Sequence, residues 1–338
     1  DYVHDLGLKI GTYSSPWIGT YAGFRGATSD NPDAADPECL PEDKRFQKHQ
    51  IFGRQGTKDM GISFFNAPRI GKYWFLDRDF KAMADWGFDY IKLDWHPNDV
   101  PTTERMAKEL RASGRDIVMS LSNTAPIKNA PELSKLAQLW RTGPDIHDSW
   151  DSISRCFNEF DWVKFQSPGH WNDMDMLQVG MRGRPNLFNA PPKKTNLTPD
   201  EQYTHMSMWC LQSNPLLLSC YVDKLDDFTL SLLTNDEVIE VNQDPAGKQV
   251  QRVVKAENLE VWYKPMEDGS VAVGLFNRGD KEAEIDVTWA DLGRQGPQKV
   301  RDLWRQKDLG SHAESFRSKV NPHGVVLVNV STAPSGAK

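Results

Sequence analysis

The segment that decides the fold is Tyr90-Ile-Lys-Leu-Asp94-Trp95, a short run that ends on a carboxylate. An apolar run of this length is typical of a buried strand. In an α/β barrel the catalytic groups lie at the carboxyl ends of the parallel strands. The segment therefore favours a parallel sheet and marks Asp94 as a candidate nucleophile. An Asp in this place is also a common cap for the helix that follows a strand, and this reading stays open.

On both sides of this segment, short apolar runs alternate with amphipathic stretches, as in repeated βα units. We predict strands at residues 8–13, 90–95, 116–122, 139–145, 170–177 and 215–220, and helices at residues 77–86, 102–113, 131–139, 149–164, 198–212 and 227–236. These make about six βα units, whereas a closed parallel barrel needs eight. A barrel that lacks its first two units in this chain agrees with the pattern, and so does a six-stranded doubly wound sheet.

The pattern changes after Asn242-Gln-Asp-Pro245 to alternation with period two. Strands are predicted at residues 259–263, 270–276, 283–288 and 325–329, with Gly and Asp turns between them. We therefore predict a catalytic α/β domain at residues 1–246 and an antiparallel β domain at residues 247–338. Residues 28–76 form a long connection rich in Gly, Pro and charge, which we expect to stand over the active face.

Composition limits the classes of partner. The 338 residues carry 47 acidic and 40 basic side chains and a net charge of −7, without a run of Lys and Arg. This balance argues against nucleic acid or a membrane surface as the partner, and a neutral polar substrate fits better. No apolar run reaches the length of about 18 residues that spans a membrane. The four cysteines form no C-x-x-C pair, and we predict neither a metal nor a cofactor.

A second carboxylate follows another predicted strand, in Leu139-Trp-Arg-Thr-Gly-Pro-Asp145-Ile-His-Asp-Ser-Trp150. The strands before Asp94 and Asp145 are alternate strands of the predicted sheet, so both carboxylates can point into one cavity. A pair about 5 to 5.5 Å apart suits retaining glycoside hydrolysis, in which one carboxylate attacks the anomeric carbon and the other protonates the leaving oxygen.

The motifs around these acids resemble glycoside hydrolase family 27, the α-galactosidases and α-N-acetylgalactosaminidases. The resemblance rests on Tyr-Ile-Lys-Leu-Asp94, Asp145-Ile-His-Asp-Ser-Trp150, Pro168-Gly-His-Trp-Asn-Asp-Met-Asp175 and Asn242-Gln-Asp-Pro-Ala-Gly247, and it extends over essentially the whole chain. It implies a (β/α)8 TIM-type barrel followed by an antiparallel β-sandwich. The first two barrel units would then be the ones this chain lacks, and a complementary N-terminal segment or an oligomer partner would supply them. The resemblance also implies an extracytoplasmic location: periplasmic, secreted or lysosomal.

The resemblance assigns roles to residues in these motifs. Asp94 matches the nucleophile and Asp145 the acid/base of a retaining exo-glycosidase that removes terminal α-galactosyl residues from an oligosaccharide or glycan. Lys92 matches a lysine that binds sugar hydroxyls, although a counter-ion for Asp94 is the simpler role. The other residues expected to line the sugar site are Arg141, Tyr13, Trp95 and Asp175, the last of which lies in a motif of the pocket wall.

Substrate choice in the family depends on a loop that here reads Ser122-Asn-Thr-Ala125. It resembles the form with small residues, Ser and Ala, which leaves room for an N-acetyl group at the 2-position of the sugar. Trp95-His96 stands where the family has a small residue and a Cys, so the rim of the cavity should differ. The loop keeps an α-N-acetylgalactosaminidase as an alternative. In the family, the acids that read the 4- and 6-hydroxyls of the sugar come from the second barrel strand, one of those expected to be missing here, so a β-L-arabinopyranosidase is a further alternative.

Two other classes of function remain in view. One is a metal-dependent hydrolase built on His147, His170, Asp173 and Asp175. This set lacks the short His spacing that metal sites on barrel strands usually show. The other class is an inactive or carbohydrate-binding fragment, because a barrel without two units would expose strand edges.

Overall fold

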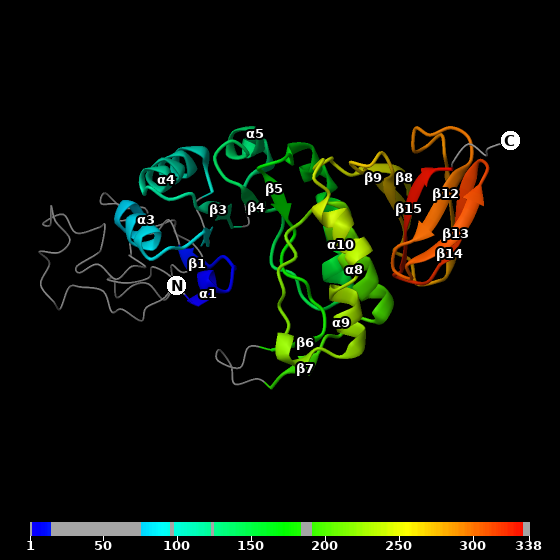
Figure 1. Cartoon of the computed structure of the whole chain (residues 1–338), viewed down its shortest axis with the longest axis horizontal. Coiled ribbons are helices and arrows are strands. Elements are labelled where there is room, and N and C mark those ends of the chain that lie inside the picture. The colour runs from blue at the N-terminus through cyan, green and yellow to red at the C-terminus, as the bar shows by residue number, and fades with distance from the viewer. Residues whose placement is uncertain (1, 15–75, 95–97, 123–124, 184–190, 334–338) are drawn as a thin grey trace, which may run out of the picture. The chain divides into compact units, whose positions relative to one another are not determined.

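The segment Tyr90–Leu93 is strand β2 in a computed structural model of the chain (Figure 1). The structure describes residues 2–14, 76–94, 98–122, 125–183 and 191–333. The chain divides into two compact units, Asp1–Pro144 and Asp145–Lys338. Residues 28–75 of the predicted long loop and the pair Trp95-His96 lie outside the described residues. The predicted domain boundary after residue 246 stays a prediction.

The first unit alternates strands and helices around a parallel sheet. Its elements are α1 (Tyr2–Asp5), β1 (Gly11–Ser14), α3 (Leu76–Asp85), β2, α4 (Val100–Ala112), β3 (Val118–Leu121), η3 (Ile127–Asn129), α5 (Ala130–Leu133) and β4 (Leu139–Arg141). The strands lie in the order β1-β2-β3-β4, and the printed pairs are parallel. The predicted βα alternation is thus confirmed here. The helix predicted at residues 131–139 is wrong in length, because the α-helix ends at Leu133.

The two faces of this sheet differ in chemistry. Ile91 and Leu93 of β2 are at most 1% exposed, as is Leu121 of β3. These side chains share one face by the alternation of a strand. The residues between them, Lys92 and Ser120, are register partners on the opposite face. An apolar face and a polar face on the same strands are what a sheet needs when helices cover one side and a polar site lies on the other.

A partly buried polar cluster around Asp89 holds the amino end of strand β2. The carboxylate of Asp89 accepts a hydrogen bond from the Ile10 backbone N–H at 3.0 Å and lies 2.8 Å from His4 Nε2 and 2.6 Å from Arg115 Nη2. The hydrogen bond from Ile10, followed by those from His4 and Arg115, holds the pKa of Asp89 well below its usual value. The cluster ties α1 to the strands at the end opposite Asp94.

The second unit begins with helices and short strands. Its elements up to residue 243 are α6 (Trp150–Arg155), η4 (Cys156–Phe165), β5 (Trp171–Asp173), β6 (Met181–Arg182), β7 (Lys193–Lys194), α8 (Pro199–Leu211), η5 (Val222–Lys224), α9 (Asp227–Leu233) and α10 (Asp236–Gln243). The helix predicted at residues 149–164 is α-helical only to Arg155 and continues as a 3₁₀ helix.

The strand predicted at residues 215–220 is wrong as a regular strand. In the described residues it makes only isolated bridges, Leu177 with Leu218 and Arg182 with Cys220. Pro215 lacks a backbone N–H and cannot donate a hydrogen bond to a neighbouring strand. The leucines after it pair with the neighbouring chain only at isolated positions. The bond from Leu177 N to Leu217 O, at 2.7 Å, keeps the segment alongside the chain that follows β5.

Antiparallel strands form the rest of this unit. They are β8 (Gln251–Ala256), β9 (Leu259–Pro265), β10 (Val271–Asn277), β11 (Ala283–Thr288), β12 (Gln298–Asp302), β13 (Lys307–His312), β14 (Ser315–Val320) and β15 (Val325–Thr332). They build a six-stranded sheet in the order β13-β12-β15-β10-β9-β8 and a two-stranded sheet of β11 and β14. Apolar side chains of both sheets meet in one core that includes Val273, Ile285 and Phe316. The predicted period-two domain is confirmed.

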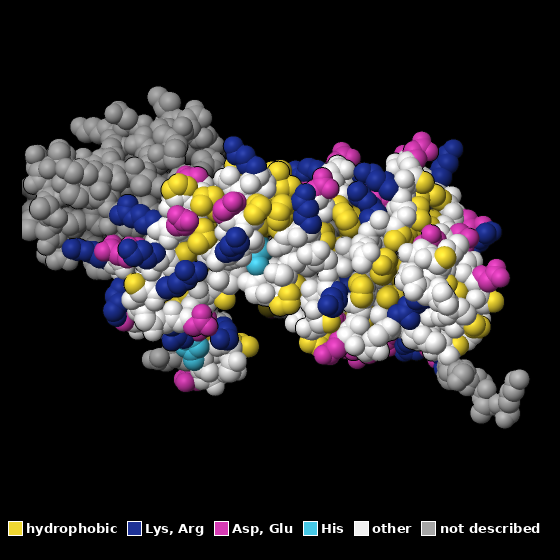
Figure 2. Space-filling view, turned by 90° about the horizontal axis from the view of Figure 1, so that it is seen from above, with side chains coloured by type: hydrophobic (Ala, Val, Ile, Leu, Met, Phe, Trp, Pro, Cys, Tyr) yellow, Lys and Arg dark blue, Asp and Glu magenta, His cyan; other side chains and the backbone are white. Residues whose placement is uncertain are grey.

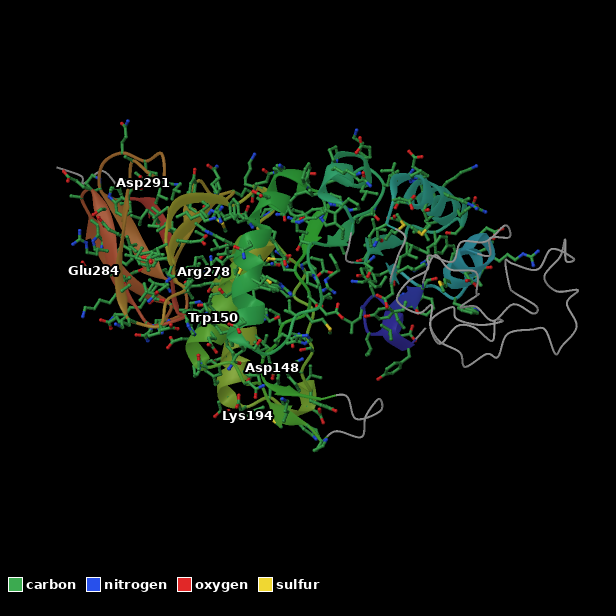
Figure 3. All side chains as sticks on the ribbon, turned by 180° about the vertical axis from the view of Figure 1, so that it is seen from behind. Asp148, Trp150, Lys194, Arg278, Glu284 and Asp291 are labelled. Atoms are coloured by element: carbon green, nitrogen blue, oxygen red, sulfur yellow. The ribbon has the colours of Figure 1, made fainter. Side chains whose placement is uncertain are left out.

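Helix α8 and the six-stranded sheet share a hydrophobic core. Trp209 and Leu211 of α8 belong to the same buried cluster as Trp262 and Phe276 of the sheet. Figure 1 shows α8 and α10 beside this end of the sandwich. At the same junction Arg278, labelled in Figure 3, lies over the Phe157 ring and pairs with the fully buried Glu260 at 2.9 Å. The sandwich is therefore packed on the helices rather than attached by a linker.

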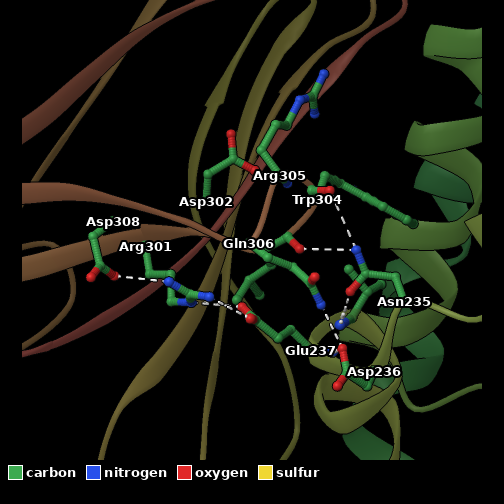
Figure 4. Close-up of polar contacts among 11 residues, drawn as sticks. Asn235, Asp236, Glu237, Arg301, Asp302, Trp304, Arg305, Gln306 and Asp308 are labelled. Carbon is green, nitrogen blue, oxygen red and sulfur yellow. Dashed lines mark hydrogen bonds and ion pairs between the residues drawn. The ribbon is translucent and has the colours of Figure 1, made fainter. Parts of the chain in front are cut away.

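A polar cluster adds to this junction at the start of α10 (Figure 4). Arg301 of β12 holds Glu237 through two hydrogen bonds of 2.8 and 2.6 Å, a bidentate pair of the strong kind. The Asn235 side chain caps α10 and donates to the carbonyl oxygens of Leu303 and Trp304. The β12–β13 hairpin and the helix are thus fixed to each other by backbone as well as side-chain contacts.

The buried His205 of α8 predicts a loss of stability in acid. Its Nε2 accepts the Gln178 backbone N–H at 2.9 Å, so this nitrogen carries no proton in the folded state. Burial, helped by the charge of Arg182, lowers the pKa of His205 to about 3. The unfolded chain binds a proton at its usual pKa of about 6.5, so stability falls as the pH drops from 6.5 toward 3.

We expect this group to reduce the free energy of unfolding by about 2 kcal/mol between pH 7 and pH 5. His205→Gln is the matched variant, because its amide oxygen can accept the same N–H and does not titrate. Urea unfolding at the two pH values should show that the free energy of unfolding falls more from pH 7 to pH 5 in the unchanged protein than in His205→Gln. Equal losses in both proteins would contradict the assignment.

Candidate active site

The polar face of the first sheet gathers most of the predicted site residues. Tyr13, Lys92 and Ser120 are register partners on β1, β2 and β3. Two residues further along each strand, on the same face, stand Asp94 and Ser122, and Arg141 occupies the matching position on β4. The carboxyl ends of neighbouring parallel strands therefore present one tyrosine, one lysine, one carboxylate, one hydroxyl and one guanidinium. This is the edge where barrel enzymes carry their chemistry.

Asp94 lies directly after β2 and is partly exposed. Its backbone N–H donates to the Ser14 carbonyl at 2.8 Å, which extends the β1–β2 ladder by one residue. The Ser122 hydroxyl donates to Asp94 Oδ1 at 3.3 Å. The carboxylate is thus oriented by the strand below it and by a side chain from the next strand. Asp94 does not cap the following helix, because the N-cap of α4 is Asp99.

The remaining predicted residues of this unit differ in exposure. Lys92, Arg141, Ser122 and Ala125 are each less than 10% exposed, whereas Tyr13 is 59% exposed. The Arg141 Nη2 donates to the Gly143 carbonyl at 3.2 Å, which turns the guanidinium along the chain that leads toward Pro144. Lysine and arginine side chains that are buried at a strand end need anionic or polar partners, because burying an unpaired charge costs free energy. Trp95 lies outside the described residues.

The second unit carries Asp145 on a loop that we call the Asp145 loop, residues 145–150. Asp145 is exposed, while Ile146 beside it is buried. The loop is folded on itself, because Ser149 N–H donates to the His147 carbonyl at 2.9 Å and His147 N–H donates to the Ser152 hydroxyl at 2.9 Å. Figure 3 labels Asp148 and Trp150 of this loop. An exposed carboxylate on a tightly bonded loop has a defined backbone position and can be reached from solvent.

Asp148 ties the Asp145 loop to the β6–β7 segment. Its carboxylate pairs with Arg182 at 2.8 Å and with Lys193 at 3.9 Å, and it accepts the Asn196 backbone N–H at 3.1 Å. Burial acts to raise the pKa of Asp148, but the Asn196 hydrogen bond and the two positive charges outweigh it, so the pKa lies below the usual value. Asp148 therefore serves as a charged anchor. The sequence reading left it out, although it stands in the same motif.

Asp175 holds the backbone next to Asp145. Its Oδ2 accepts the Ile146 N–H at 2.9 Å, and its Oδ1 accepts the Met176 N–H at 2.8 Å. The residue adopts a φ of +86°, a backbone conformation that costs free energy for any residue except Gly. The Trp209 indole donates to its carbonyl at 2.8 Å and helps to fix this conformation. These contacts favour a role for Asp175 in positioning Asp145, in addition to its predicted place in the pocket wall.

Asp175→Ala is expected to lower kcat by roughly 10-fold to 100-fold with a small change in KM, because Asp145 is the predicted acid/base and a misplaced catalytic group costs about that much. The Ile146 N–H would lose its acceptor and Asp145 would lose its support. Steady-state kinetics measures kcat and KM separately.

Asp226→Ala is the matched control, since Asp226 also accepts a backbone N–H, at the N-cap of α9. It should lower stability by about 1 kcal/mol and leave kcat unchanged. Equal kinetic effects would argue against positioning by Asp175.

The predicted pairing of Asp94 and Asp145 in one cavity stays a prediction, because the two residues belong to different units. The proposed metal set of His147, His170, Asp173 and Asp175 finds no support in side-chain grouping. Among residues 2–14, 76–94, 98–122, 125–183 and 191–333, no three His, Cys, Asp or Glu side chains are placed to hold a metal ion.

The surface charges are mixed in sign. Figure 2 shows dark blue and magenta side chains interspersed over the described part of the visible face. Such a surface has no extended basic field on that face to attract a polyanion. None of the helices in the described part of the chain combines the length and apolar character needed to cross a bilayer. The expected absence of nucleic-acid and membrane partners stays a prediction.

Comparison with known proteins adds independent findings. A family model described as alpha galactosidase A matches residues 57–244, and one described as the alpha galactosidase C-terminal beta sandwich domain matches residues 256–330. Alpha-galactosidase 2 of Arabidopsis thaliana is 36% identical over 330 residues, which are 96% of this chain and 69% of that protein.

Among solved structures, a β-L-arabinopyranosidase of glycoside hydrolase family 27 from Geobacillus stearothermophilus superimposes with a TM-score of 0.81 and 28% identity. The match covers 100% of this chain and 77% of that enzyme. A variant of the same enzyme in complex with arabinose gives a TM-score of 0.79, also with 28% identity, and covers 98% of this chain and 77% of its own. The fold is a TIM-type barrel with a C-terminal β-sandwich, as the parallel and antiparallel sheets described above indicate.

Proposed function

Because the chain belongs to glycoside hydrolase family 27, it is a glycoside hydrolase that acts on galactosides, and we propose that it does so by retaining double displacement. In this proposal Asp94 is the nucleophile and Asp145 the acid/base. The substrate is a terminal α-galactosyl residue of an oligosaccharide or glycan. We place the enzyme outside the cytoplasm by analogy with the family.

One observation supports the proposal most strongly. The carboxylate of Asp94 stands at the carboxyl end of β2, on the same face as Lys92 and Arg141 and in contact with the Ser122 hydroxyl. A carboxylate among donors of this kind can attack a sugar while its neighbours bind hydroxyl groups. Donors without a carboxylate would suit binding alone, so this arrangement favours an enzyme over a carbohydrate-binding fragment.

In the first step the Asp94 carboxylate attacks the anomeric carbon, and the bond to the leaving oxygen breaks. Asp145 gives its proton to that oxygen, so the leaving group departs as a neutral alcohol. The donors near Asp94 hold the sugar for in-line attack, which converts binding into orientation of the reacting atoms.

In the second step a water molecule attacks the same carbon and releases Asp94. Asp145, now ionised, takes a proton from this water and returns to its acid form. Two inversions leave the sugar with its original configuration. The hydrogen bonds on the Asp145 loop suit this double use, because the same carboxyl must face first the leaving oxygen and then the water.

Two further sugars have specific support. Ser122 and Ala125 are small and buried, which agrees with room for a 2-acetamido group. The Geobacillus stearothermophilus β-L-arabinopyranosidase aligns with all of this chain, which favours a pentose of the same ring configuration. We propose α-galactoside as the main substrate and keep the N-acetylgalactosaminide and the β-L-arabinopyranoside as the alternatives that the assay must separate.

Proton NMR of the first sugar released tests the reaction. We expect the α-anomer from an α-galactoside, followed by slow mutarotation. Initial release of the β-anomer would contradict double displacement. The same assay with p-nitrophenyl α-galactoside, α-N-acetylgalactosaminide and β-L-arabinopyranoside ranks the substrates by kcat/KM. Absence of hydrolysis with all three would leave the binding fragment as the better description.

A further inference from the structure

His323 of the β-sandwich contacts the Asp145 loop. It lies in the turn between β14 and β15, and its ring stacks on the indole of Trp150 with centroids 4.2 Å apart and an interplanar angle of 13°. Trp150 is the last residue of the Asp145 loop and the first of α6. A side chain far along the chain thus contacts the loop that carries the proposed acid/base.

The position of His323 is determined by contacts on several sides. Its Nδ1 lies 2.8 Å from Glu201 Oε1, and its Nε2 lies 3.0 Å from Asp280 Oδ1. Its carbonyl accepts the Thr204 hydroxyl at 2.7 Å. Glu201 and Thr204 belong to α8, so the ring is held between the helix layer and the sandwich. Its face, rather than its nitrogens, is left for Trp150.

The backbone of His323 is held in an uncommon conformation. Its φ is +56°, in the left-handed region that few side chains adopt without cost. Such a conformation persists where the surroundings determine it, and it is a reason to look for function. Here the conformation places the imidazole on Trp150. A glycine or asparagine would suit the turn better, so the turn alone does not account for this residue.

The contacts continue from Trp150 to Asp145. The N-cap of α6 is Ser149, whose N–H donates to the His147 carbonyl at 2.9 Å. Ile146, next to Asp145, is fixed to Asp175 at 2.9 Å. The loop is therefore supported at one end by Asp175 and at the other by the His323–Trp150 stack. A shift of Trp150 changes the course of the short segment between these supports.

We propose that His323 is a positioning residue for the acid/base, so that the β-sandwich takes part in the reaction through the Asp145 loop. This inference rests on the proposed role of Asp145. It predicts a defect limited to proton transfer. Glycosides with poor leaving groups need that proton, whereas activated aryl glycosides depart with little help. A junction contact with only a structural role would lower stability and affect both substrates alike.

Two complementary substitutions separate the ring from its polar contacts. His323→Gln keeps a polar side chain for Glu201 and Asp280 but removes the aromatic face. His323→Phe keeps the face and removes the polar contacts. Ser207→Ala is the matched junction control, because it removes another contact between α8 and the sandwich, the hydrogen bond from the Trp304 indole to the Ser207 hydroxyl, without touching His323. The substrates are the methyl and the 2,4-dinitrophenyl glycosides of the sugar that the enzyme hydrolyses.

For the methyl glycoside, we expect His323→Gln to lower kcat/KM by roughly 10-fold to 100-fold. For the dinitrophenyl glycoside, the same substitution should change kcat/KM by less than about threefold, since this leaving group needs little acid catalysis. His323→Phe should keep kcat/KM for the methyl glycoside near that of the unchanged protein, and so should Ser207→Ala. If His323→Gln does not fold, Trp150→Leu removes the other ring of the stack and should give the same selective loss.

Equal losses for both glycosides in His323→Gln would overturn the proposal. So would the same selective loss in Ser207→Ala, or a loss in His323→Phe as large as that in His323→Gln. Asp145→Ala, measured on the same two glycosides, separates this proposal from the proposed function. If Asp145→Ala is not selective, the acid/base assignment fails. If it is selective and His323→Gln is not, only the role of His323 fails.

Discussion

Asp94→Asn is expected to lower kcat by roughly 10⁴-fold or more, because removing the attacking group of a covalent mechanism removes the reaction path. The amide is nearly the same size as the carboxylate and can still accept from the Ser122 hydroxyl, so the fold should persist. Initial rates with the p-nitrophenyl glycoside measure the loss. Circular dichroism and the unfolding midpoint verify that the variant is folded.

The control for this variant is Asp99→Asn in the same βα unit. Asp99 is the N-cap of α4 and accepts the Thr102 N–H at 2.8 Å, a role that Asn fills about as well. Its kcat should be unchanged. Asp94→Gly with added azide gives a second measurement, because azide should attack from the vacated side and form a glycosyl azide of inverted configuration. Near-normal turnover in Asp94→Asn would remove Asp94 from the mechanism.

Asp145→Ala is expected to lower kcat/KM for unactivated glycosides by roughly 10² to 10⁴, the usual contribution of general acid catalysis. For 2,4-dinitrophenyl glycosides the first step should be nearly unaffected, and release of the sugar from Asp94 should become slow. A burst of dinitrophenol before a slow steady state would reveal that intermediate. Azide should raise kcat and give a glycosyl azide of retained configuration.

Asp151→Ala is the matched control for this second variant. Asp151 lies in the first turn of α6, close in sequence to the Asp145 loop, and it is exposed. Its loss should weaken the favourable charge at the helix start by a few tenths of a kcal/mol and leave kinetics unchanged. An Asp145→Ala enzyme that loses activity equally on all leaving groups, without rescue by azide, would assign Asp145 a structural role.

Local patterns predicted much of the fold. The strand before Asp94, the helix before it and the period-two alternation around residues 283–288 all appear in the structure, since each follows from burial on one face of an element. The strand predicted at residues 215–220 is wrong, because a run of leucines signals burial without specifying a hydrogen-bonded ladder. Strands β12, β13 and β14 escaped prediction, and their many polar residues explain why.

Some features of the candidate site could also be predicted from local patterns, whereas others could not. The motif around Asp94 placed a carboxylate at a strand end, and alternation along β2 placed Lys92 on its face. Both follow from neighbours in the chain. The Ser122 contact required the register of β3 against β2, which pairs Lys92 with Ser120. A parallel register depends on how helices pack over the sheet, and a single strand does not encode it.

The sequence by itself determined the order of the βα units, the β domain after them and the two acids on which the proposed reaction depends. These follow from periodicity and from residue types within a few positions of each other. Only the tertiary structure decided that Asp175 supports Ile146 and that His323 stacks on Trp150. Such contacts join residues far apart in the chain, and their geometry depends on how distant segments pack together, which no local pattern records.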